Sequence, residues 1–125
     1  MNTAQDLIPD ARVREHLAAR LPHWRLEESR LVRRYRTAGW KASLLAAGAV
    51  GHLAEAAWHH PDLLVSFGSL EVRLHSHDAG GITARDLALA RRIEDLVVWQ
   101  PGPEDNPLEG TPAGEVEARH VLPDA

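Results

Sequence analysis

Two histidine pairs are the residues best suited to chemistry in this sequence. His59 and His60 directly precede Pro61, and His75 and His77 are separated by one serine. The chain has eight histidines and no cysteine, which excludes thiolate nucleophiles, disulfides and cysteine-ligated metals. Histidine changes its charge near neutral pH and also ligates metals. The sequence therefore indicates either proton transfer or metal binding.

The first histidine pair is expected at the end of a long helix. Residues 38–58 are rich in alanine and leucine, and Pro61 disfavours helical geometry at His60, so the helix should end around residue 58 or 59. The negative end of the helix dipole, together with Glu55 one turn earlier on the same face, favours a positive charge on His59. These features suit a histidine that donates or accepts a proton.

The second histidine pair is expected at the end of a strand. Residues 63–67 and 70–76 predict a hairpin, because the second segment alternates apolar and polar side chains. After a glycine-containing loop, residues 83–98 have the apolar spacing of a helix. The Thr83-x-x-Asp86 start of this helix predicts a capping box.

The remaining segments complete one small domain. Residues 9–21 predict an amphipathic helix, and residues 24–26 and 31–35 predict a hairpin whose second strand places alternate side chains on one face. We therefore expect a domain over residues 1–98. Residues 99–125 are rich in proline, glycine and acidic residues, which is typical of a tail or a strap without its own core.

Composition and charge limit the partners and the location. The net charge is −4, so nucleic acid is not an expected partner. The sequence has no apolar run of about 18 residues and no signal-like start, so we expect a cytoplasmic protein without a membrane span. Gly48 and Gly51, inside the predicted long helix, indicate a closely packed or oligomeric face. A basic cluster could hold a phosphate, although alternation on an exposed strand explains it more simply; it comprises Arg30, Arg33, Arg34, Arg36 and Lys41.

The spacing of seven residues resembles the signature of the pterin-4a-carbinolamine dehydratase family. These residues are Glu55, His59, His60, Pro61, Phe67, His77 and Asp86. The loop 77–83 and Trp24 are also similar to family members, and the resemblance runs from about residue 7 to 98. It implies an α+β fold of order α-β-β-α-β-β-α, in which three helices pack on one face of a four-stranded antiparallel sheet. It also implies a homodimer or a homotetramer.

The resemblance further implies an activity. The family dehydrates 4a-hydroxytetrahydropterin, which aromatic amino acid hydroxylases produce, to quinonoid dihydropterin, without a metal or a cofactor. It implies that His59, His60 and His77 transfer protons, while Glu55 and Asp86 orient them or tune their charge. The implied substrate-binding residues are Trp58, Pro61, His75, Ser76, Asp78, Phe67 and Trp24.

The sequence departs from the family pattern at one position and leaves alternatives open. Relatives usually carry Asp or Asn where this chain has Trp58, which can stack on a pterin but cannot accept its N–H groups. One alternative is an enzyme with zinc or iron held by both histidine pairs. Another is a non-enzymatic assembly or dimerisation factor of the same fold. Taken alone, His59 and His60 would be ordinary exposed residues and Asp86 only a helix cap.

Overall fold

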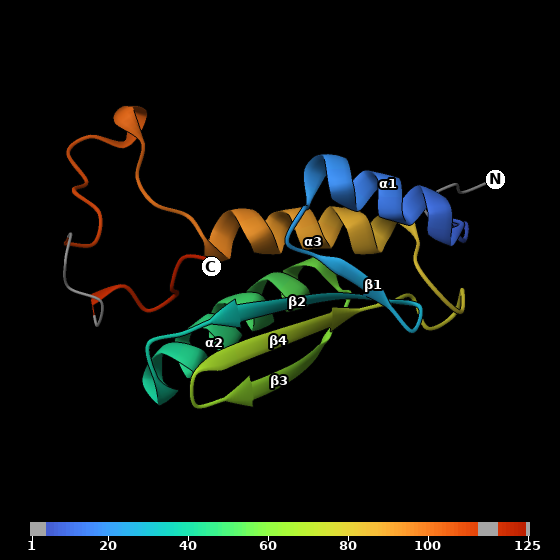
Figure 1. Cartoon of the computed structure of the whole chain (residues 1–125), viewed down its shortest axis with the longest axis horizontal. Helices are drawn as coiled ribbons and strands as arrows, with labels where there is room; N and C mark the ends of the chain where they lie inside the picture. Colours follow the sequence, from blue (N-terminus) through green and yellow to red (C-terminus); the bar gives the residue numbers. More distant parts are fainter. Residues whose placement is uncertain (1–4, 113–117, 125) are drawn as a thin grey trace.

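The structure is a computed structural model that describes residues 5–112 and 118–124 (Figure 1). Its elements follow the predicted order. They are α1 (Asp10–Arg20), β1 (Arg25–Glu27), β2 (Arg30–Arg36), α2 (Trp40–Ala57), β3 (Asp62–Ser66), β4 (Ser69–Leu74) and α3 (Ala84–Val97), followed by the short 3₁₀ helix η2 (Pro103–Asp105). No helix among the described residues is long and apolar enough to cross a membrane.

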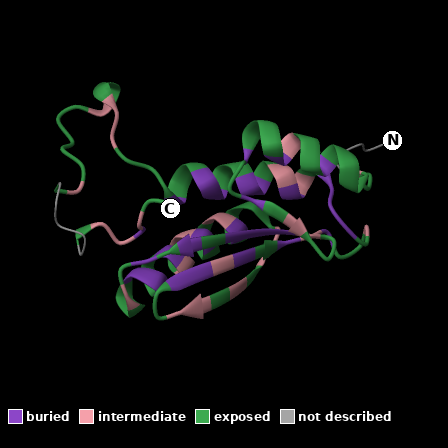
Figure 2. Cartoon of the chain, viewed as in Figure 1, coloured by how far each residue is buried: buried purple, intermediate pink, exposed green. Residues whose placement is uncertain are grey.

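The four strands form one antiparallel sheet in the order β1-β2-β4-β3. In the register of β2 and β4, Leu31 lies opposite Leu74 and Tyr35 lies opposite Leu70. Because side chains alternate between the faces of a strand, this register gathers the apolar residues on one face. That face shares a single core with side chains of all three helices (Figure 2). The predicted α+β fold is confirmed.

The core forms where the helices meet the sheet. Val13 of α1, Val50 of α2 and Ile93 of α3 are fully buried against the inner face of the sheet. In Figure 1, α1 and α3 lie along each other on one side of the strands, and α2 lies behind the strands in this view. In this packing α2 contacts β3, β4 and α3. This matters because both histidine pairs lie close to the ends of these elements.

The described part of the C-terminal extension leaves the domain and returns to it (Figure 1). Residues 99–112 contain η2 and no other helix or strand. Residues 118–124 then run beside the chain that follows β2, where Val121 pairs with Thr37 and is buried. The division of the chain at residue 98 stays a prediction.

Candidate active site

A cavity of about 400 Å³ lies beside the end of α2 and the loop that follows β4. The residues that line it come from both histidine pairs and their neighbours: Arg30, Trp58, His59, His60, Asp62, His75, His77, Asp78 and Arg85. Two histidine pairs that are far apart in the sequence therefore face one space.

A left-handed turn at Trp58 places the first pair in this cavity. Trp58 has φ 52° and ψ 46°, and the His59 amide donates a hydrogen bond back to the Ala54 carbonyl at 3.1 Å. This geometry ends α2 and redirects the chain. His59 therefore does not continue the helix. Our expectation that Glu55 lies beside His59 is wrong, because Glu55 Oε1 pairs instead with His60 Nε2 at 2.8 Å.

His59 is held by a carboxylate from the start of α3. Its Nε2 lies 2.6 Å from Asp86 Oδ1, and the Asp86 side chain is fully buried. The other oxygen, Oδ2, accepts hydrogen bonds from the Ser76 hydroxyl at 2.7 Å and from the Thr83 amide at 2.9 Å. The predicted capping box is present, and the same carboxylate also contacts His59. Because a carboxylate only accepts, His59 donates through Nε2, which leaves Nδ1 as its second exchangeable site.

The second pair is joined by a hydrogen bond between its two rings. His75 Nε2 and His77 Nδ1 are 2.9 Å apart. In this bond one nitrogen carries a hydrogen and the other does not, so the tautomers of the two rings are coupled. His77 is exposed, and its Nε2 is not used in this bond. The tautomer of His77 therefore changes together with that of His75.

His60 and Trp58 form the exposed rim of the cavity. The two rings meet edge to face with their centres 4.9 Å apart. Trp58 is 74% exposed, which leaves its indole available to a flat ligand.

Several predicted substrate residues lie away from the cavity. Trp24 is buried, and its indole N–H donates to Glu94 Oε1 at 2.9 Å. Phe67 lies in the turn between β3 and β4, at the opposite end of β3 from His60, and lines another hollow beside α2. Ser76 is fully buried behind the cavity, where it supports Asp86. Pro61 is half-buried and is absent from the lining.

The cavity also contains residues that our sequence interpretation did not assign to it. Arg30, Asp62 and Arg85 line it. Arg85 donates to Asp78 at 3.3 Å, while its buried Nε has no hydrogen-bond partner among the described residues. The sequence signal that could have placed Arg85 at the cavity is its position directly before Asp86 in the first turn of α3. No three histidine, aspartate or glutamate side chains are grouped to hold a metal ion in the part of the chain that the structure describes.

Comparisons with known proteins indicate the family of this chain. Residues 6–96 match the family model of pterin 4 alpha carbinolamine dehydratase. A protein of Aquifex aeolicus, provisionally named a pterin-4-alpha-carbinolamine dehydratase, is 44% identical over 77 residues, which are 62% of this chain and 78% of that protein. A protein of Chloroflexus aurantiacus with the same provisional name is 40% identical over 90 residues, which are 72% of this chain and 96% of that one.

A solved structure shares the fold. It is described as a transcriptional coactivator/pterin dehydratase from Brucella melitensis, and it superposes with a TM-score of 0.65 at 21% identity. The match covers 71% of this chain and 96% of that chain. Because the family model spans most of the chain, and the match at 40% identity covers 96% of the Chloroflexus protein, the chain belongs to the pterin 4 alpha carbinolamine dehydratase family.

Proposed function

We propose that this protein dehydrates 4a-hydroxytetrahydropterin to quinonoid dihydropterin and water, and so supports the recycling of the pterin used by aromatic amino acid hydroxylases. The observation that carries the proposal is the cavity that His59, His60 and His77 share, with His59 fixed by the buried Asp86. The family relation supports the same reaction.

The reaction needs two proton transfers at neighbouring atoms. The bond between the ring carbon and the hydroxyl oxygen breaks, and the adjacent ring nitrogen loses its proton as a carbon–nitrogen double bond forms. One protonated imidazole delivers a proton to the leaving oxygen, and a neutral imidazole accepts the proton of the nitrogen. The atoms balance as one molecule of water. Such acid–base catalysis contributes about 10²- to 10⁴-fold.

In this site the carboxylates orient the histidine rings, and the histidines transfer protons. Asp86 orients the His59 ring through Nε2, so His59 Nδ1 exchanges protons with the substrate. Glu55 holds His60 in the same way, at the exposed rim. His75 determines the tautomer of His77, whose Nε2 then exchanges protons.

The remaining lining suits a flat, polar ring. Trp58 offers an exposed indole on which a pterin stacks. The Arg85 guanidinium, whose Nη2 donates to Asp78, offers N–H groups to an acceptor such as the pterin carbonyl, and Asp78 accepts from ring N–H groups. These contacts take over the hydrogen bonds that Trp58 cannot make.

The test is a stopped-flow assay with carbinolamine generated by a hydroxylase. We expect the wild type to accelerate the loss of the 4a-hydroxypterin absorbance, and His59→Ala or His77→Ala to slow it at least about tenfold. His16→Ala is the matched control, because His16 lies on α1 and away from the cavity. A wild type no faster than buffer would defeat the proposal.

We also propose that the protein is a homo-oligomer that associates through α2. Trp40, Leu44 and Leu45 are each about half exposed along this helix, and a Cβ added at Gly48 or Gly51 would meet nothing within 4 Å. An exposed apolar helix face with small residues suits packing against a second copy. Light scattering should show a dimer or a tetramer, and Leu45→Glu should produce monomers. A monomeric wild type contradicts this.

A further inference from the structure

The described end of the chain packs against the domain although it lies outside the residues that the family shares. Residues 118–124, which we call the strap, run antiparallel to the chain just after β2. The Ala38 amide donates to the His120 carbonyl at 3.0 Å, and the Leu122 amide donates to the Arg36 carbonyl at 2.9 Å. Between them, Val121 is 7% exposed. The strap thus occupies a backbone edge as an added strand does.

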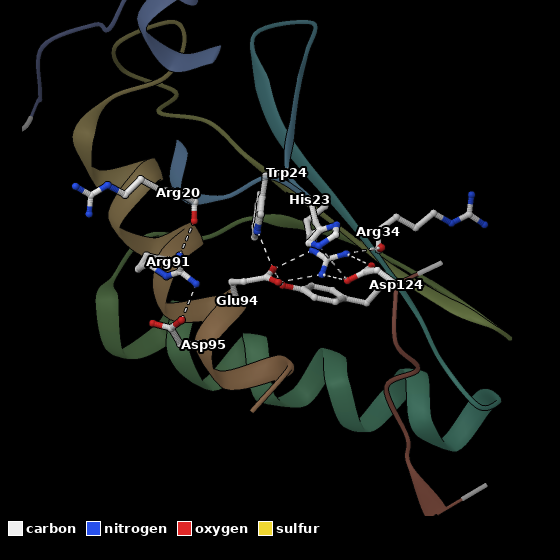
Figure 3. A network of polar contacts seen from close by, with 10 residues as sticks. Arg20, His23, Trp24, Arg34, Arg91, Glu94, Asp95 and Asp124 are labelled. Atoms are coloured by element: carbon white, nitrogen blue, oxygen red, sulfur yellow. Dashed lines mark hydrogen bonds and ion pairs between the residues drawn. The ribbon is translucent and has the colours of Figure 1, made fainter. Parts of the chain in front are cut away.

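Beneath the strap lies a buried arginine. Arg33 points from β2 into the inner layer and is 2% exposed. A buried charge requires partners, and Glu94 of α3 accepts from Arg33 Nε at 2.9 Å and from Nη2 at 3.0 Å. Glu94 Oε1 also accepts from the Trp24 indole at 2.9 Å and from the Tyr35 hydroxyl at 2.7 Å (Figure 3). These bonds hold the guanidinium in one orientation.

The domain by itself provides acceptors for only some of the N–H groups of this guanidinium. An arginine has five N–H groups, of which Glu94 takes two and the Arg34 carbonyl, at 3.1 Å, takes a third. Asp124 of the strap takes the last two, from Nη1 to Oδ1 at 2.8 Å and from Nη2 to Oδ2 at 2.9 Å (Figure 3). The domain therefore presents two parallel, fixed donors, which is the geometry that binds a carboxylate.

We propose that Arg33 and the backbone edge at residues 36–38 form a binding site for an extended, carboxylate-bearing peptide segment, and that the strap is its intramolecular ligand. The edge binds the backbone of the ligand, while Arg33 selects a carboxylate three residues after an apolar side chain. Arg36 adds a hydrogen bond to the Pro123 carbonyl at 2.8 Å. The connection through residues 99–112 raises the local concentration of the ligand. Part of the Asp124 side chain, 32%, stays exposed, as expected of a ligand that docks from outside.

Hydrogen exchange in the full-length chain tests how the strap is held. Asp124→Asn removes the charge of the ligand, and Glu109→Gln is the matched control because it removes an exposed carboxylate elsewhere in the extension. We expect the amides of Ala38 and Leu122 to exchange at least about tenfold faster in Asp124→Asn, because charge-assisted hydrogen bonds are lost. Glu109→Gln should exchange like the wild type. Equal rates in the two variants overturn the proposal.

Binding in trans tests whether the site recognises the ligand itself. A peptide with the sequence of residues 118–124 and blocked ends is added to the full-length Asp124→Asn variant, and the Arg33 Nε–H resonance is followed. We expect a saturable shift, and about tenfold weaker binding of a peptide that carries Asp124→Asn. No saturable shift, or global unfolding of the variant, overturns the proposal. Neither measurement involves a pterin, so the outcome is independent of the proposed activity.

Discussion

His59 Nε2 lies 2.6 Å from Asp86 Oδ1, and this contact fixes which nitrogen of the ring carries the proton. In Asp86→Asn, an amide N–H directed at His59 would favour the opposite tautomer, while the amide oxygen still accepts from Thr83. We expect dehydration to slow at least about tenfold with the fold retained, because acid–base catalysis requires the correct tautomer. Stopped-flow rates and ¹⁵N spectra of the His59 ring measure the two effects.

Asp95→Asn is the matched control for this change. Asp95 also lies on α3, but it is exposed and pairs with Arg91 one turn earlier. Its variant should keep both the rate and the His59 tautomer of the wild type. An Asp86→Asn enzyme with an unchanged rate would contradict the orienting role of Asp86.

His75 is expected to act through His77 rather than on the substrate. His75→Ala removes the partner of His77 Nδ1, which lies 2.9 Å away. We expect kcat to fall about tenfold with little change in KM, since a role in substrate binding would raise KM instead. His75→Gln should recover most of the rate because an amide also bonds to Nδ1. Equal kinetics for the alanine and glutamine variants would argue against a role of His75 that acts through His77.

Trp58 carries a conformational cost that another residue would avoid. Its φ of 52° lies in the left-handed region, which glycine and asparagine adopt more readily than other residues. Trp58→Asn should therefore raise the free energy of unfolding by about 0.5–1 kcal/mol, measured by urea denaturation. It should also raise KM several-fold, because the stacking surface is lost.

Trp40→Asn provides the comparison for Trp58→Asn. Trp40 is also about half exposed, but it begins α2 with ordinary helical geometry, so the same replacement there should gain no stability. If both variants gained equally, the left-handed conformation would not be the cause.

Local patterns predicted the elements, and partners distant in the sequence decided the site. The alternation of β2 correctly placed Leu31, Arg33 and Tyr35 on one face. Our interpretation nevertheless placed Arg33 in an exposed basic cluster. It is buried because Glu94 and Asp124, 61 and 91 residues away, satisfy its charge, and no local spacing reveals such partners.

The same limit applies to the candidate site. The capping role of Asp86 followed from the short Thr83-x-x-Asp86 spacing, whereas its contact with His59 joins residues 27 positions apart. The partner of Glu55 was mistaken for another reason. Tryptophan gives no sequence signal for a left-handed turn, and this turn carries His59 away from the face of α2 on which we expected it.

The network around Arg33 predicts loss of stability in acid. Hydrogen bonds from Arg33 lower the pKa of Asp124 below its ordinary 3.8. Burial alone would raise the pKa of Glu94, but its bonds to Arg33 and Tyr35 outweigh burial and lower it below 4.5. The unfolded chain therefore takes up protons at higher pH than the native chain, so this stabilisation is present above about pH 4.5 and declines as the pH falls through the native pKa values.

Urea denaturation between pH 7 and pH 3, roughly the range over which carboxylates titrate, measures this decline. Asp124→Asn should lower the free energy of unfolding at pH 7 by about 1–2 kcal/mol and flatten its fall in acid, because one of the two titrating carboxylates is gone. Glu109→Gln, which removes a carboxylate outside the network, should keep the slope of the wild type. A slope that Asp124→Asn leaves unchanged would show that Asp124 does not couple folding to protonation.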